Sequence, residues 1–174
     1  METVGSLASY WFFIRFGLEP GHLGALFFAS SLLTTISLWA AARLARRIGL
    51  LNTMAFTHVP SSLFLMAVPF APEAWMAVAL WLLRALFVQM DVPTSQSYTM
   101  AVVTGAERTA MAGATTVSRS AGIAAGPSVG TVLWSAIGPS APFLAGGAVE
   151  IAYDLTLWWL FRRIKPPEEV SPPA

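Results

Sequence analysis

Six apolar stretches follow one another along this chain, and several charged residues lie inside them rather than between them. Five such residues, Arg84, Asp91, Arg119, Glu150 and Asp154, fall within segments that otherwise resemble membrane helices. A charge at the centre of a bilayer costs about 2.5–3.5 kcal/mol on insertion scales, so these residues usually face a protein interior or a water-filled path. The pattern therefore indicates a transport pathway through a helical bundle.

The composition favours a lipid environment. Apolar residues make up 56% of the chain and charged residues 11%, whereas a soluble domain carries roughly 25% charged residues. The chain has no cysteine, and its two histidines, His22 and His58, lie far apart. We therefore expect no metal site and no cofactor. The expected partners are the lipid bilayer and a small-molecule substrate, with no nucleic acid.

Each apolar stretch predicts one α-helix, because about 20 helical residues span a hydrocarbon core of roughly 30 Å. We expect an all-α membrane protein in which residues 1–165 form a six-helix transmembrane bundle and residues 166–174 form a disordered cytoplasmic tail. The expected helices are Thr3–Phe16, Leu23–Ala42, Leu50–Phe70, Ala74–Val103, Thr109–Ile137 and Ala141–Phe161. The first is short, with missing turns expected upstream of Met1, and Pro60 is expected to break the third.

The loops at alternate ends of these helices differ in charge. The basic set comprises Arg43, Arg46 and Arg47 in a loop over residues 43–49, then Arg108, then Arg162, Arg163 and Lys165. The opposite set holds Glu19 and Glu73. By the positive-inside rule we expect the basic end and both termini to be cytoplasmic, in the plasma (inner) membrane. Tryptophans fit belts at the two interfaces: Trp75 and Trp134 outside, and Trp39, Trp158 and Trp159 inside.

The fifth stretch contains a stripe of small residues at a spacing of four. Its members are Ser118, Gly122, Gly126 and Gly130, and Pro127 follows the second glycine. Such a stripe lets two helix backbones approach closely in lipid, and the proline predicts a bend. The stripe indicates either simple close packing or a flexing, leak-tight seam between helices that move.

The fourth stretch carries Arg84 and Asp91 two turns apart on one face, and Pro93 predicts a kink beyond them. Helices broken at this depth commonly frame substrate sites, which makes Gln96 and its polar neighbours candidate ligands. Asp91 and Arg119 lie at similar depths, about 18 Å and 16 Å from the cytoplasmic end. We expect them to pair, either as a structural contact or as a proton-controlled gate.

Glu150 and Asp154 lie one turn apart in the sixth stretch. Like charges at this spacing repel, so one carboxylate is expected to stay protonated or to reach water or a basic partner. His58, beside Pro60, reads as a packed polar residue in preference to a proton relay.

Three segments carry sequence motifs, and the order of these motifs along the chain resembles that of a known family. Residues 42–49, with the letters ARLARRIG, are similar to the cytoplasmic motif G-x-x-x-D-R-x-G-R-R of the major facilitator superfamily, except that Ala45 replaces the usual aspartate. This change puts the charge lock of that motif in doubt. Arg84, followed by residues 91–98 and 107–110, resembles the fourth or tenth helix of that family and its cytoplasmic exit. Residues 122–130 are similar to the G-x-x-x-G-P-x-x-G motif of its proton antiporters.

The resemblance covers nearly the whole chain and implies one half of a twelve-helix transporter. The family binds its substrate between two six-helix bundles, and we favour the C-terminal half for this chain. A missing N-terminal half, or a second copy, would then supply the opposite wall. The resemblance implies alternating-access transport with no enzymatic activity, and its antiporter-like motif implies proton-coupled efflux. The alternatives are a membrane-embedded enzyme, for which no convergent catalytic motif is present, or a non-functional truncated fragment.

Overall fold

The computed structural model describes residues 2–90 and 107–162, with side chains from residue 5 onward in the first of these ranges. These residues form helices α1 (Glu2–Phe16), α2 (Pro20–Ile48), α3 (Leu50–Ala67), α4 (Ala74–Phe87), α6 (Arg108–Ala136) and α7 (Ala141–Phe161), and the short 3-10 helix η1 (Val68–Phe70). Among the described residues there is no β-strand. The all-helical prediction is therefore confirmed for this part of the chain.

Prolines and glycines set several of the helix limits. Pro20 occupies the first turn of α2, where its missing N–H has no intrahelical partner to lose. Gly17 and Gly49 follow α1 and α2 with φ angles of 65° and 86°, a backbone region that glycine enters without a steric penalty. The chain can therefore reverse in very few residues, and beyond Gly49 helix α3 packs against α2.

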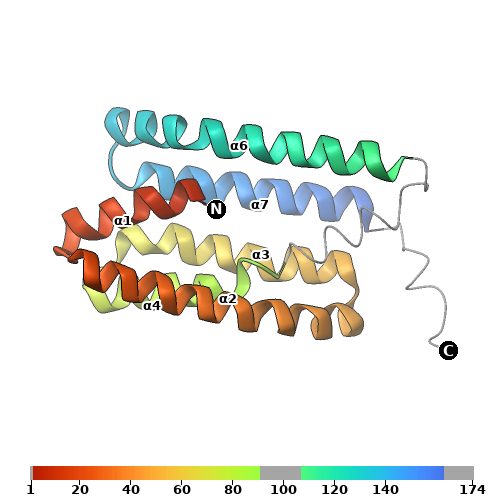
Figure 1. Ribbon diagram of the computed structural model, residues 1–174, viewed down its shortest axis with the longest axis horizontal. Helices are drawn as coiled ribbons and strands as arrows, with labels where there is room; N and C mark the ends of the chain where they lie inside the picture. Colours follow the sequence, from red (N-terminus) through yellow and green to blue (C-terminus); the bar gives the residue numbers. More distant parts are fainter. Residues whose placement is uncertain (1, 91–106, 163–174) are drawn as a thin grey trace.

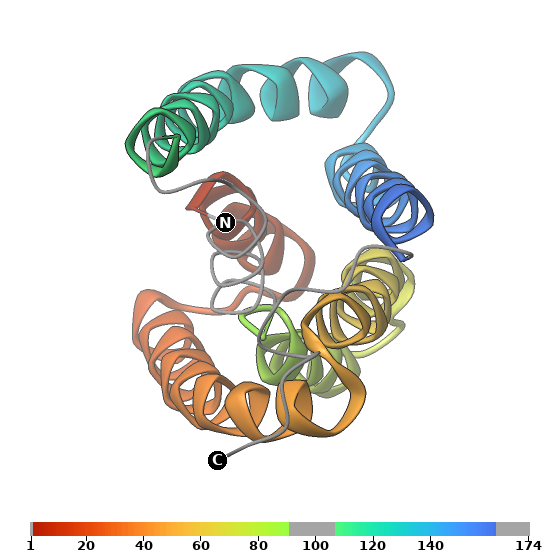
Figure 2. The ribbon, with the colours of Figure 1, turned by 90° about the vertical axis from the view of Figure 1, so that its right-hand side faces the viewer.

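The long helices lie side by side along the long axis of the molecule (Figure 1). Seen end-on, α6, α7, α3 and α2 follow one another around an arc, and α1 lies on its inner side (Figure 2). Contacts join α3 to α7, α4 to both α2 and α3, and α1 to α6. Helix α3 therefore stands between α4 and α7, the two helices that carry the interior charges.

An aromatic core fills one end of the bundle. The rings of Trp11 and Phe143 lie 5.5 Å apart between centroids, and those of Phe12 and Trp81 lie 6.1 Å apart. These contacts fasten α1 to α7 and to α4. Because Glu150 lies two turns beyond Phe143, or about 10 Å along α7, the aromatic core closes one end of the region that contains the charges.

Two local predictions were wrong, and a third falls largely outside the described residues. Arg43, Arg46 and Arg47 do not form a loop, because α2 continues to Ile48 and includes them in its last turns. Pro60 does not break α3, which runs through it to Ala67. Within the described residues the fourth helix ends at Phe87; the remainder of the expected Ala74–Val103 helix lies almost wholly outside them.

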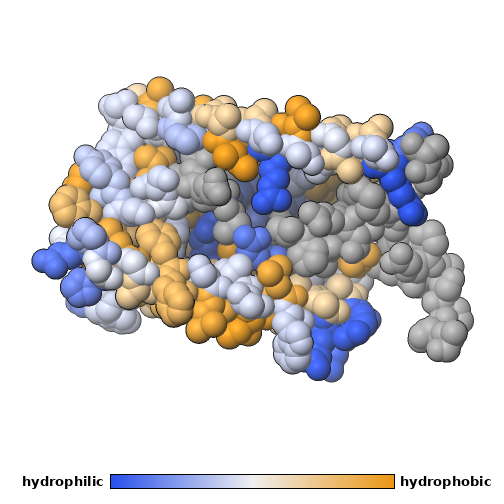
Figure 3. All heavy atoms as spheres, in the orientation of Figure 1, coloured by the Kyte–Doolittle hydropathy of each residue, from blue (hydrophilic) through white to orange (hydrophobic). Residues whose placement is uncertain are grey.

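Among the described residues, two helices are long and apolar enough, by length and composition, to cross a membrane: α2, and the Leu50–Phe70 segment formed by α3 and η1. Helix α4 is apolar but shorter. Hydrophilic side chains gather on the surface at the C-terminal end of α2 (Figure 3). Large apolar side chains such as Phe28 and Trp39 are exposed. That all six described α-helices span the membrane stays a prediction.

Candidate functional site

Arg84 lies in the interior, on the face of α4 that packs against α3. Its side chain is only 4% exposed, and its Nη2 atom lies 3.9 Å from Oε1 of Glu150 on α7. Its Nε and Nη2 atoms have no hydrogen-bond partner in the described part of the chain. The guanidinium group therefore interacts with Glu150 by charge and lies near the ring of Trp81, whose centroid is 5.4 Å from its Cζ atom.

Glu150 connects Arg84 to α3. Its Oε2 atom accepts a hydrogen bond of 2.9 Å from the Ser62 hydroxyl. The same hydroxyl lies 3.1 Å from the backbone oxygen of His58. One hydroxyl hydrogen cannot bond well to both acceptors, so the direction of the Ser62 hydroxyl depends on the charge of Glu150.

Asp154, one turn further along α7, has a different partner. Its Oδ2 atom lies 2.6 Å from Nδ1 of His58, and the two side chains are 1% and 12% exposed. The two carboxylates of α7 therefore have basic partners on different helices, which offsets the repulsion expected from their spacing. The sequence left three alternatives for this pair: a protonated carboxylate, contact with water, or a basic partner. The geometry matches the basic partner.

A close approach of α3 and α7 brings these groups together. A Cβ atom added at Gly147 would lie 3.0 Å from the backbone oxygen of Ser62 and would clash with the side chain of Met66. Small residues permit such close helix packing in lipid. Gly147 precedes Glu150 by one turn, so the tight contact places its carboxylate against α3.

A cavity of about 540 Å³ opens beside Glu150, between α1, α6 and α7. Its walls are apolar, and Glu150 is the one charged side chain among the described residues that line it. The wall includes Gly122, Gly126 and Gly130 from α6, Gly146 and Val149 from α7, and Leu7 from α1. Most of the predicted stripe thus faces a cavity that has one carboxylate in its wall.

The small-residue stripe packs closely at only part of its length. A Cβ atom at Gly130 would clash with Leu7 of α1, whereas one at Gly122 would meet nothing within 4 Å. Ser118 is exposed, and α6 continues as a helix through Pro127. Close packing is therefore seen at Gly130, while the stripe is open toward the N-terminal end of α6.

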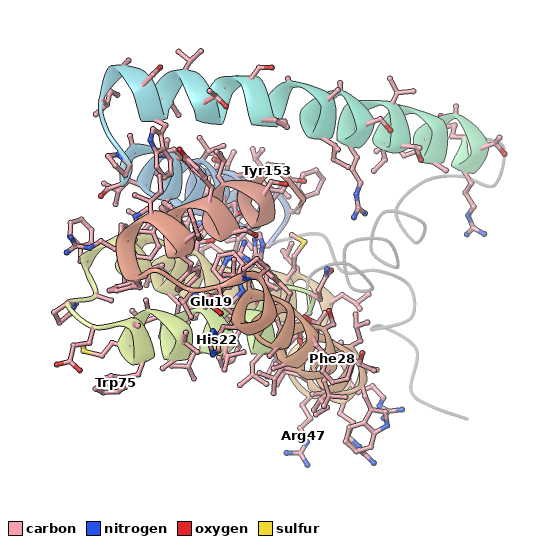
Figure 4. All side chains as sticks on the ribbon, turned by 60° about the vertical axis from the view of Figure 1, so that its left-hand side comes forward. Glu19, His22, Phe28, Arg47, Trp75 and Tyr153 are labelled. Atoms are coloured by element: carbon pink, nitrogen blue, oxygen red, sulfur yellow. The ribbon has the colours of Figure 1, made fainter. Side chains whose placement is uncertain are left out.

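The other predicted residues lie away from this network or outside the described residues. Arg119 is exposed on α6, and its expected partner Asp91 lies outside the described residues, as does Gln96. The basic residues of α2 are exposed at its C-terminal end; Arg43 stacks over the ring of Trp39, 3.7 Å from its centroid. Figure 4 shows Arg47 pointing outward from this helix.

The sequence reasoning missed Ser62 and undervalued His58. Both lie on one face of α3, four residues apart, and they contact Glu150 and Asp154, which have the same spacing on α7. Matching spacings on two apolar helices were the signal that could have paired them. Across residues 2–90 and 107–162, no group of three or more metal-binding side chains comes together.

The comparison with protein families decides the class. The family model for the Major Facilitator Superfamily matches residues 2–174. The chain belongs to the major facilitator superfamily. Proteins of this superfamily are integral membrane transporters, and the resemblance drawn from the motifs is confirmed. No curated protein and no solved structure matches the chain.

Membership in the major facilitator superfamily gives the buried charges a context. The superfamily builds its substrate and ion sites near the middle of the membrane, from side chains on neighbouring helices. Ionisable residues at this depth are expensive to bury and commonly mark ion or substrate pathways. The network of Arg84, Glu150, Ser62, His58 and Asp154 is therefore the candidate functional site.

Proposed function

We propose that this chain forms one six-helix half of a transporter that exports a small molecule in exchange for protons by alternating access. The half is proposed to be the C-terminal one. Six further helices, from an N-terminal half or a second copy of this chain, would form the opposite wall. The proposed setting is the plasma (inner) membrane, with both termini and the arginines of α2 on the cytoplasmic side.

The observation that carries the proposal is the position of Glu150. It lines the cavity, lies 3.9 Å from the buried Arg84, and accepts a hydrogen bond from Ser62. A side chain that contacts both a cavity and a buried cation can couple binding in the cavity to the position of the cation. Because Arg84 makes no hydrogen bond to Glu150, little directional bonding opposes a change of partner.

Protonation of Glu150 provides the coupling step. The ionised carboxylate attracts Arg84 and accepts the Ser62 hydrogen; the neutral acid loses the attraction and can donate its own hydrogen to Ser62. Binding of a proton therefore alters the contacts between α7 and both α3 and α4. Helix contacts with two arrangements are what an alternating-access cycle requires.

The charge distribution supports the proposed orientation. The arginines at the end of α2 and the start of α6 lie at one end of the bundle, opposite the turn that holds Glu73 (Figure 1). Trp75 points away from the other helices beside that turn (Figure 4), and its side chain is 66% exposed. Basic loops favour the cytoplasm and tryptophans favour the interface.

The proposal is tested in inside-out vesicles that contain the full chain and carry an acidic interior. A panel of amines, neutral ring compounds and carboxylates is added, and a pH-sensitive dye reports release of the gradient. We expect at least one compound to release the gradient with the wild type but not with Glu150→Gln. Glu73→Gln, at an exposed carboxylate, is the control and retains the response. A wild type that responds to no compound contradicts proton-coupled exchange by this chain paired with a second copy of itself.

A further inference from the structure

The cavity beside Glu150 has the form of a small-molecule site. Its volume of about 540 Å³ lies within the range of ligand pockets, which are mostly apolar with a few polar groups that fix orientation. Glycines on α6 and α7 expose helix backbone in its wall and leave room between the helices. The shape and lining suit an apolar ring system.

The charge in the wall adds a second requirement. Oε2 of Glu150 is engaged by Ser62, whereas Oε1 lies 3.9 Å from Arg84 and receives no hydrogen bond from any described residue. A carboxylate oxygen with free lone pairs accepts a short, charge-assisted bond from a cationic nitrogen. No cation lines the cavity within the described residues, but Arg84 lies 3.9 Å from the same oxygen, so a bound ammonium group must displace the guanidinium group.

Arg84 keeps a second favourable contact, with an aromatic ring, when Glu150 changes partner. Its Cζ atom lies 5.4 Å from the ring centroid of Trp81 on the same helix, within the distance for a cation–π contact. Contact with that ring does not depend on Glu150. A ligand cation can therefore compete for Oε1 without leaving the guanidinium group against apolar atoms alone.

We propose that this cavity binds an apolar, ring-containing amine whose ammonium group contacts Oε1 of Glu150. The proposal rests on the proposed transport function and gives its substrate class. The rings occupy the space between α6 and α7. Because Gly122 has no side chain, the space left beside it sets the size of the rings that fit. The ligand is therefore selected in two ways: the Glu150 carboxylate favours a positive charge, and the space at Gly122 limits the volume of the rings.

The test is a binding titration of the purified full chain in detergent. Its two probes are 1-pyrenemethylamine and 1-pyrenemethanol, which share a ring system but differ in charge at pH 7. Energy transfer from tryptophan to pyrene reports binding, because Trp134 adjoins the cavity residue Leu133. We expect the amine to bind at least tenfold more tightly than the alcohol, and Glu150→Gln to make the two affinities equal.

The volume requirement is tested on α6. Gly122→Leu places a side chain in the cavity at a position where an added Cβ atom meets nothing within 4 Å; it should weaken both probes at least tenfold. Gly113→Leu is the matched control, since that position on the same helix is equally open but does not line the cavity. It should leave both affinities unchanged, and equal thermal unfolding shows that both variants fold.

Two results overturn the proposal: equal affinity of the wild type for amine and alcohol, or unchanged binding in Gly122→Leu. The titration needs no proton gradient, so it is independent of the vesicle assay. Amine binding without release of the gradient contradicts proton exchange but supports the site. Release of the gradient by other compounds, with no amine binding, overturns only the substrate class.

Discussion

Removal of either side chain from the His58–Asp154 pair should destabilise the bundle unequally. His58→Ala leaves the Asp154 carboxylate, 1% exposed, without its imidazole partner. Breaking a buried ion pair in this way costs about 3–5 kcal/mol in soluble proteins, and we expect about 3 kcal/mol here because unfolded chains in lipid also find polar partners. Asp154→Ala leaves an imidazole that can lose its proton, so its cost should be smaller, about 1–3 kcal/mol.

The double variant, His58→Ala with Asp154→Ala, tests whether these costs arise from the pair. Because it leaves no uncompensated charge, it should cost less than the sum of the two single variants, with a coupling free energy of about 2 kcal/mol.

The measurement is unfolding by SDS in mixed micelles, followed by far-UV circular dichroism. His22→Ala is the control, because His22 is exposed near the start of α2, and it should leave the unfolding midpoint unchanged. Strictly additive costs of the two single variants would refute the reasoning.

Two further predictions concern packing of α3 against α7. Gly147→Val should destabilise the bundle by about 1–3 kcal/mol, because the new side chain overlaps Met66; Gly113→Val, at an open position, should not lower the unfolding midpoint, because valine has a higher helix propensity than glycine. Asn52→Ala removes the bond of 3.0 Å that Trp158 donates to the amide oxygen and should cost about 0.5–1.5 kcal/mol. Both are measured by the same unfolding titration, and unchanged midpoints would contradict the α3–α7 packing described above.

The helix order was readable from the sequence because apolar stretches and glycine or proline turns alternate along the chain. Residues 50–67 and 141–161 form helices where the hydropathy predicted them. The end of α2 was misjudged because arginines suggest a loop, yet basic side chains also favour the last turn of a helix. Pro60 was misjudged because neighbouring helices can support a helix that lacks one hydrogen bond.

The candidate site was only partly predictable. Charges inside apolar stretches identified Arg84, Glu150 and Asp154, because the cost of burial makes such residues conspicuous in any sequence. Their partners were not predictable, since Ser62 and His58 reach them through helix packing across about 90 residues of chain. The contact at Gly147 that creates this packing depends on backbone separation, which periodicity does not report.

The central claim is that the cavity beside Glu150 opens alternately to the two sides of the membrane. The chain has no cysteine, so Val149→Cys introduces a single thiol in the cavity wall. Its labelling by a membrane-impermeant maleimide is measured from each side of the membrane, in right-side-out and inside-out vesicles, at pH 5.5 and pH 8. The account predicts labelling from both sides, with a ratio that changes with pH and becomes constant in Glu150→Gln. Labelling from one side alone at both pH values would contradict it.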